Sequence, residues 1–182
     1  RMYTITNVGG TPGGDAFLLV TEEKAALIDS GFACSAGRMV ANIKDILQDR
    51  PLDYVLLTHS HYDHASGSAY VQDAWPDARV AGSVYAKKIL ETPSARAVIR
   101  EMNDNAALLA GISEYEDRTD RLHIDIAVSE GDVIGLGTMK LRVIPAPGHT
   151  KCCTAFWCEE EKLLLSCETL GVPAGGGMVM PC

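Results

Sequence analysis

The chain has 182 residues, of which 47% are hydrophobic and 22% charged, and its formal net charge is −8. This length suits one domain over residues 1–182 with a sizeable core, and the composition is that of a globular protein, not a disordered one. No cluster of Lys and Arg indicates a nucleic-acid interface, and no apolar run is long enough to cross a bilayer. We therefore expect neither nucleic acid nor a membrane as a partner.

In the first third of the chain, short apolar runs predict strands over Tyr3–Val8, Ala16–Val20 and Ala25–Ile28. Apolar residues at helical spacing predict a helix over Ser35–Gln48. A short buried strand is then expected at Tyr54–Thr58.

The middle of the chain alternates helices and a strand. We expect a helix near Ala65–Gln72, a strand near Arg79–Ala81 and a helix near Ser83–Leu90. Pro93 opens a longer helix that extends to about Gly111 and carries one apolar stripe. The stripe is typical of core packing, and covering a substrate is the alternative.

A polar loop is expected over Ser113–Arg121. After it, alternating apolar residues predict five strands: Ile124–Val128, Val133–Ile134, Met139–Ile144, Thr154–Cys158 and Lys162–Leu165. Strands, then alternating helices and strands, then strands again indicate an α+β fold in which one sheet packs on another with helices outside.

The cysteines are spaced unlike a disulfide framework or a zinc ribbon, since no Cys-x-x-Cys pair occurs and two of them are adjacent. Together with the absence of a visible signal peptide, this favours reduced thiols and a cytoplasmic location. The chain turns apolar again near its end and then stops at Cys182. We expect the native protein to continue there.

Three histidines and an aspartate follow the predicted strand that ends at Thr58: His59, His61, Asp63 and His64. Imidazole and carboxylate groups are ligands of zinc and similar metals. In an extended chain His59 and His61 project to the same side, and a turn into the next helix brings Asp63 and His64 beside them. Burial without a metal would leave several imidazole nitrogens unpaired. The run therefore predicts one or two bound metal ions.

The two remaining histidines lie elsewhere. His149 stands in the segment Pro-Gly-His-Thr and is either a further ligand or a plain turn residue. His123 lies in a charged segment, so we expect it at the surface.

Three motifs in this order resemble the metallo-β-lactamase superfamily: Asp29 in Leu-Ile-Asp-Ser-Gly, the His-x-His-x-Asp-His run, and Gly-His-Thr around His149. The resemblance covers nearly all of the chain. It implies an αββα sandwich, incomplete in this chain, with the metal site at the edge where the two sheets meet. It also implies that Asp29 orders the loops beneath the site and is not a ligand.

The resemblance implies ligands at matching positions. His59, His61 and His149 would surround one metal, and Asp63 and His64 would bind a second.

Two departures from the family pattern concern the second metal. The family has a bridging aspartate in a Ser-Gly-Asp-Thr-like stretch, where this chain has Ser-Cys-Glu-Thr. We expect Glu168 to be the bridging ligand, with a Cys167 thiolate as the alternative. The family also contributes another histidine downstream, and no histidine follows His149 here. Either the chain continues in the native protein or the second metal is weakly held.

The expected activity is metal-assisted hydrolysis of a small molecule, with Zn2+ as the metal and manganese or iron as alternatives. Asp63 would orient the attacking water or carry a proton. The helical segment after Pro93 makes the layout similar to thioesterases and glyoxalase II-like hydrolases, whose substrates are acyl thioesters. Lactonases and phosphodiesterases share the ligand set, and a true β-lactamase is less favoured.

Two other classes stay open. Superfamily members that reduce oxygen or nitric oxide generally have a carboxylate where this chain has His61, which favours the hydrolase. A non-catalytic metal-binding protein of the same fold is the other alternative. The oligomeric state cannot be predicted from the chain.

Overall fold

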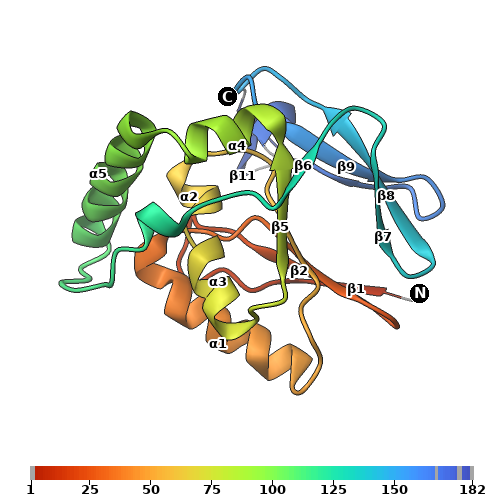
Figure 1. The fold of residues 1–182 in the computed structure, drawn as a ribbon, viewed down its shortest axis with the longest axis horizontal. Coiled ribbons are helices and arrows are strands. Elements are labelled where there is room, and N and C mark those ends of the chain that lie inside the picture. Colours follow the sequence, from red (N-terminus) through yellow and green to blue (C-terminus); the bar gives the residue numbers. More distant parts are fainter. Residues whose placement is uncertain (1–2, 167, 176–177, 181–182) are drawn as a thin grey trace.

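Two β-sheets pack face to face, and the helices gather on the outer face of the first sheet (Figure 1). This arrangement is seen in a computed structural model that describes residues 3–166, 168–175 and 178–180.

The first sheet has six strands in chain order. Its strands are β1 (Tyr3–Asn7), β2 (Phe17–Thr21), β3 (Ala25–Ile28), β4 (Tyr54–Leu56), β5 (Arg79–Ser83) and β6 (Ile126–Val128). β1 to β3 are antiparallel, whereas β3 to β6 are parallel. All four residues of β3 are buried because helices cover one face of the strand and the second sheet covers the other.

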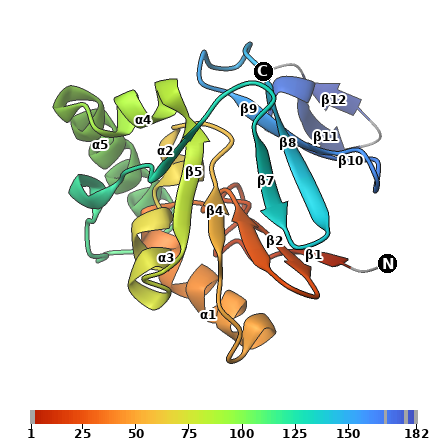
Figure 2. The same cartoon turned by 45° about the vertical axis from the view of Figure 1, so that its right-hand side comes forward.

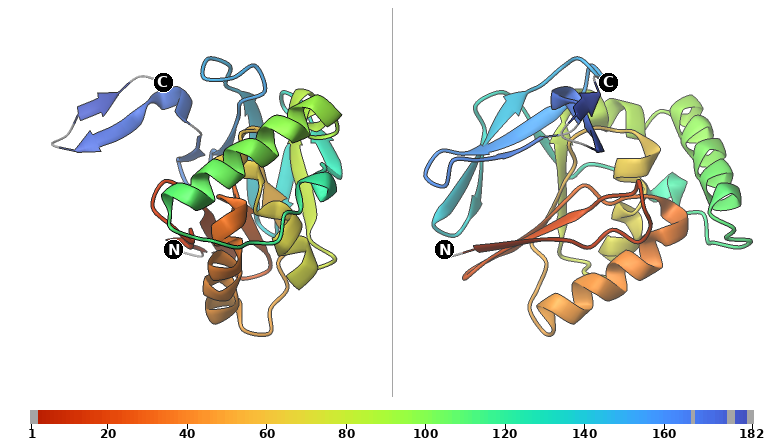
Figure 3. Two further views of the ribbon diagram at one scale, coloured as in Figure 1. Left: turned by 90° about the vertical axis from the view of Figure 1, so that its left-hand side faces the viewer. Right: turned by 180° about the vertical axis from the view of Figure 1, so that it is seen from behind.

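The second sheet is antiparallel, with strand order β10-β9-β8-β7. Its strands are β7 (Val133–Leu136), β8 (Met139–Pro145), β9 (Thr154–Cys158) and β10 (Leu163–Leu165). Along β8 the side chains of Met139, Leu141 and Val143 are buried and those between them are exposed, as expected for a sheet with one covered face. A separate hairpin of β11 (Val172–Gly175) and β12 (Met178–Met180) stands away from the body (Figure 3, left).

The helices follow the strands of the first sheet. They are α1 (Ala36–Leu47), α2 (Tyr62–Ala65), α3 (Ser68–Ala74), α4 (Val84–Leu90) and α5 (Pro93–Leu109), with short 3-10 turns η1 (Ala33–Ser35), η2 (Thr119–Arg121) and η3 (Glu168–Leu170). α1 shows why they form: Met39, Ile43 and Leu47 recur at helical spacing and are all buried.

The core has two parts. One lies between the sheets, where Leu19 and Leu56 of the first sheet meet Leu141 and Phe156 of the second. The other lies between the first sheet and the helices, for example around Leu27.

The α+β class and the packing of sheet on sheet are confirmed, and most predicted elements lie within a few residues of the observed ones. The helix expected over Ala65–Gln72 is found as α3, which begins three residues later, at Ser68, and the short helix α2 before it was not predicted. The two helices are separated at Ser66 and Gly67, where the Gly67 N–H donates to the Gly31 carbonyl oxygen and a Cβ at Gly67 would lie 1.9 Å from the Ser30 carbonyl oxygen. The β11–β12 hairpin was not predicted.

An αββα sandwich has four layers, and the described residues form three of them. No helix among these residues covers the outer face of the second sheet (Figure 2).

Cys34, Cys152 and Cys158 are free thiols. Within the described ranges, no helix combines the length and apolar character needed to cross a bilayer.

Candidate metal centre

The six predicted ligands come from four places in the chain that meet at one end of the first sheet (Figure 2). His59 and His61 follow β4, Asp63 and His64 lie in α2, His149 lies between β8 and β9, and Glu168 begins η3. This is the carboxyl end of the parallel strands, where open sheets commonly bind ligands. The structure thus brings together all six residues.

One group of ligand atoms is formed by His59, His61, His149 and Glu168, which all lie within 4.8 Å of one another. His149 Nε2 is 3.0 Å from His61 Nδ1 and 2.7 Å from Glu168 Oε2. His59 is fully buried, and its Nε2 is 3.9 Å from Glu168 Oε2. That nitrogen has no hydrogen-bond partner among the described residues. A buried, unpaired imidazole nitrogen beside two other imidazoles fits a metal ion.

The second group contains Asp63, His64 and Glu168. His64 Nε2 lies 3.6 Å from Asp63 Oδ2 and 3.9 Å from Glu168 Oε1. The two oxygens of Glu168 therefore face different groups, Oε2 toward the three histidines and Oε1 toward His64. A carboxylate in this position can join two metal ions.

Asp29 supports both groups from below. Its Oδ1 accepts a hydrogen bond of 2.7 Å from the Thr58 N–H, and its Oδ2 accepts one of 2.7 Å from the Thr58 hydroxyl. Oδ2 also lies 2.9 Å from His64 Nδ1. Asp29 adopts a φ of 56°, a left-handed conformation uncommon for non-glycine residues, and these contacts hold it. Both oxygens of Asp29 are thus engaged with Thr58 and His64, and its carboxylate also forms a third group of possible ligand atoms with His59 and His64.

These contacts set the tautomers of two histidines. The Thr58 hydroxyl donates its one proton to Asp29, so it accepts from His59 Nδ1, 3.0 Å away. His64 likewise donates from Nδ1 to Asp29. In the neutral form of each ring Nε2 then carries no proton and faces the ligand groups, as a metal ligand requires.

The charges of the site differ between its two halves. Burial lowers the pKa of His59 to about 2, with His64, His61 and His149 adding to the effect. Burial also lowers the pKa of His61. For His64, burial acts in the same direction but is outweighed by the hydrogen bond and charge of Asp29, which together with Asp63 and Glu168 raise its pKa to about 9. The group around His59 and His61 thus favours neutral imidazoles, whereas the carboxylates around His64 favour a positive charge there.

Comparison with known proteins agrees with this geometry. Residues 9–177 match the family model described as the metallo-beta-lactamase superfamily. The chain belongs to the metallo-β-lactamase superfamily. Among curated relatives, "Glyoxylase B2" of Dictyostelium discoideum is 28% identical over 141 residues, which are 78% of this chain and 42% of that protein. A hydroxyacylglutathione hydrolase of Nitrobacter winogradskyi is 26% identical over 116 residues, 64% of this chain and 33% of that protein.

Solved structures show the same fold. A metallo-β-lactamase of Cronobacter sakazakii superimposes with a TM-score of 0.62 at 25% sequence identity, covering 84% of this chain and 55% of that one. The chain therefore spans about half or less of the length of these superfamily proteins.

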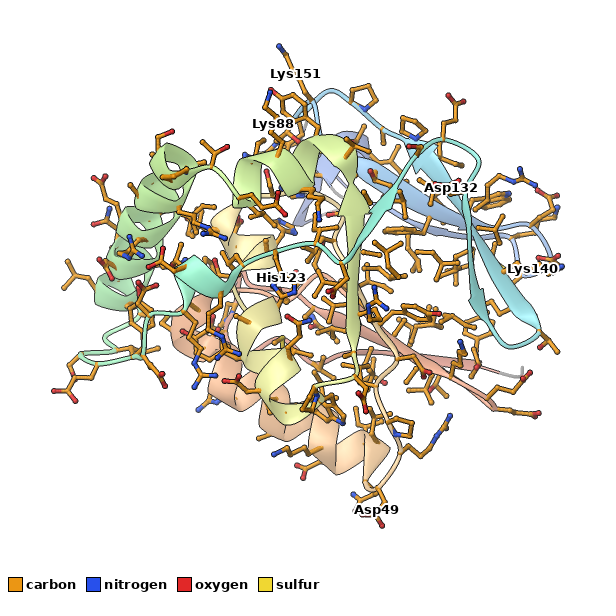
Figure 4. The ribbon with its side chains drawn as sticks, viewed as in Figure 1. Asp49, Lys88, His123, Asp132, Lys140 and Lys151 are labelled. Atoms are coloured by element: carbon orange, nitrogen blue, oxygen red, sulfur yellow. The ribbon has the colours of Figure 1, made fainter. Side chains whose placement is uncertain are left out.

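Two sequence-based expectations about individual residues can be compared with the structure. The side chain of His123, labelled in Figure 4, is 41% exposed and bonds to the Arg121 carbonyl oxygen, so its assignment to the surface is confirmed. Cys167, the alternative to Glu168, lies outside the described residues.

One residue of the site was missed. Thr58 was interpreted only as the end of a strand, yet it connects Asp29 to His59. The available signal was a polar residue directly after a buried apolar strand and directly before the first histidine.

Proposed function

We propose that this chain is the metal-binding part of a hydrolase that acts on a thioester or another ester-type small molecule. The observation that carries the proposal is the position of Glu168, with one carboxylate oxygen toward the three histidines and the other toward His64. Two ligand groups joined by one carboxylate are typical of dinuclear hydrolases.

The proposed ligands follow from the two groups. His59, His61 and His149 would hold the first metal ion, and Asp63 and His64 would hold the second. Glu168, which belongs to both groups, would be shared between them. Zn2+ suits three imidazoles with carboxylate oxygen, and manganese or iron are the alternatives. When bound, the metal lowers the pKa of a water molecule to about 7 and polarises the substrate oxygen.

The remaining work falls to side chains of the chain itself. Asp63 is partly exposed, with 24% of its side chain accessible, so it can orient the attacking water and accept its proton. Asp29 does not reach the substrate. It fixes the orientation of His64 and, through Thr58, that of His59.

The substrate class rests on the curated relatives. Two of them carry the names glyoxylase and hydroxyacylglutathione hydrolase, the second of which denotes hydrolysis of a thioester. Lactones and phosphodiesters are the alternatives, because the same ligands serve them.

The test is removal and return of the metal in the intact protein. After chelation we expect hydrolysis of an acyl thioester to be lost, and return of zinc, manganese or iron to restore it. Esters, lactones and phosphodiesters are assayed in parallel, with bound metal measured by elemental analysis. His59→Gln should remove the first metal, whereas His123→Gln, at the surface, should not. Hydrolysis unchanged by chelation, or bound metal without turnover on any of these substrates, would contradict the proposal.

A further inference from the structure

A cavity of about 550 Å³ opens beside the metal centre, between the start of α2, α4 and α5. His61, a proposed ligand of the first metal, lines it together with Tyr62 and Thr150. Its size lies within the range of roughly 300–1,000 Å³ that small-molecule sites occupy. Because one proposed metal ligand forms part of its wall, whatever fills the cavity lies against the reacting centre.

The far wall of the cavity is aliphatic. It consists of side chains from α4 and α5: Ile89, Ala95, Val98, Ile99 and Met102. Apart from His61, no ionisable side chain other than the Tyr62 phenol is among the described residues that line it. The nearest lysines in sequence, Lys88 and Lys151, are exposed, and Lys151 points away from the body (Figure 4).

A buried side chain of α5 joins this helix to the segments beside the metal centre. Asn103 is fully buried in it, accepts a hydrogen bond of 3.1 Å from the Ala33 N–H and donates one of 2.8 Å to the Ser66 hydroxyl, directly after α2. On the same helix Val98 is 58% exposed and Met102 39% exposed. Apolar side chains of this anchored helix are thus partly exposed, and they line the same cavity as His61.

We propose that this cavity binds a hydrophobic acyl group of the substrate, an aliphatic chain or an aromatic ring, with its carbonyl carbon at the metal centre. The inference rests on the proposed function. A small hydroxyacyl group could bond to the polar residues beside His61, but it would leave most of the cavity, and with it the aliphatic wall, unfilled. A charged thiol carrier such as glutathione finds no ionic partner there. The carrier therefore extends into solvent on the other side of the carbonyl.

The reaction balances without a further reagent. Water adds its oxygen to the acyl carbon, the carbon–sulfur bond breaks, and the thiol leaves with one proton while the second remains with the product acid. The product that the cavity retains is a carboxylate with a hydrophobic tail.

The first test measures binding of that product class without requiring turnover. Straight-chain carboxylates from butanoate to decanoate are titrated into the metal-loaded protein by calorimetry. We expect the affinity to rise roughly fourfold for each methylene until the cavity is full. Val98→Trp fills the cavity and should end the rise at a shorter chain. Leu108→Trp makes the same kind of change at a residue of the same helix that is 77% exposed and outside the cavity, and should have no effect.

An affinity that does not depend on chain length, or an equal effect of the two variants, would overturn the proposal. The same is true if light scattering shows a dimer that Val98→Trp alone dissociates, because the wall would then be an interface between copies. Unfolding curves of both variants check that each is folded.

The second test separates this inference from the proposed function. Two thioester series are compared, one varied in the acyl chain and one in the thiol. We expect kcat/KM to rise with the acyl chain and to stay level across the thiols. Length-dependent carboxylate binding without hydrolysis of any thioester would refute the thioesterase activity and leave the cavity assignment standing. Thioester hydrolysis at the same kcat/KM for all acyl chains would refute the cavity assignment and leave the thioesterase activity standing.

Discussion

His64 donates from Nδ1 to Asp29 Oδ2 at 2.9 Å, and this contact turns its Nε2 toward Asp63 and Glu168. The orientation of a ligand in the second group thus depends on Asp29, which we propose as its support and not as a ligand. Metal-ligating histidines commonly have such a partner on the other ring nitrogen.

Replacing this partner should weaken the second metal more than the first. Asp29→Asn keeps the size of the side chain but removes its charge, so His64 loses orientation and basicity. We expect the affinity for the second ion to fall about 10- to 100-fold, measured by competition with a chelator. Asp53→Asn is the matched control, because Asp53 accepts from the Ala25 N–H at the opposite end of β3. Equal losses in both variants would show a general effect on the strand.

The metal-free protein should be most stable near pH 6.5. The pKa of His59 is lowered to about 2, so its contribution to stability is present above the ordinary value of 6.5 and is lost as the pH falls below it. The pKa of His64 is raised to about 9, so its contribution is present below 6.5 and is lost as the pH rises toward 9. Urea unfolding of chelator-treated protein from pH 5 to 9.5 measures this. Asp29→Asn should flatten the alkaline side, and an unchanged slope there would contradict the assignment.

Glu168 should control how many metal ions are bound. Glu168→Gln keeps the shape but removes the bridging charge, so we expect the metal content to fall from two ions to one. Glu168→Asp restores the family's residue and should keep two. Elemental analysis after gel filtration counts the ions. Glu159→Gln, a change at an exposed residue that bonds to Trp157 and Lys162, serves as the control. Two ions in Glu168→Gln would exclude bridging by this residue.

Asn103 should be worth more to stability than its neighbours on α5. Asn103→Ala leaves the Ala33 N–H and the Ser66 hydroxyl without their buried partner, which we expect to cost about 2–4 kcal/mol of the free energy of unfolding. Asn105→Ala removes the same side chain two residues further on, where it is exposed, and should cost under about 0.5 kcal/mol. Equal values in urea unfolding would show that Asn103 does not anchor the helix.

Two glycines should respond in opposite ways to the same change. A Cβ at Gly67 would lie 1.9 Å from the Ser30 carbonyl oxygen, so Gly67→Ala must move α2 away from Asp29 and should reduce both stability and metal content. A Cβ at Gly37, within α1, meets nothing within 4 Å. Gly37→Ala should stabilise the protein by about 0.5–1 kcal/mol. Thermal unfolding and elemental analysis of the two variants check both expectations.

Much of the site could be predicted because its ligands are local. His59, His61, Asp63 and His64 lie within six residues after a buried strand, so the geometry of the strand end and of the following turn largely determines how they converge. Strands with clear alternation, such as β8, were predictable for the same reason.

The rest depends on contacts between distant parts of the chain. The break between α2 and α3 goes with the hydrogen bond from the Gly67 N–H to the Gly31 carbonyl oxygen, and the bonds of Asn103 join α5 to Ala33 and Ser66. Neither partner is visible in a sequence pattern. The alternation along α5 therefore indicated an apolar face but not what that face meets.

Thr58 has one further consequence. Its N–H and hydroxyl are bound to Asp29, and its carbonyl oxygen accepts a hydrogen bond of 2.8 Å from the Thr154 N–H at the start of β9. The ligands above it likewise come from both sheets, since His149 and Glu168 belong to the second half of the chain. A metal ion held by them would be a crosslink between the two halves. Chelation should then let the sheets exchange their amide hydrogens independently, whereas in the loaded protein they would open together.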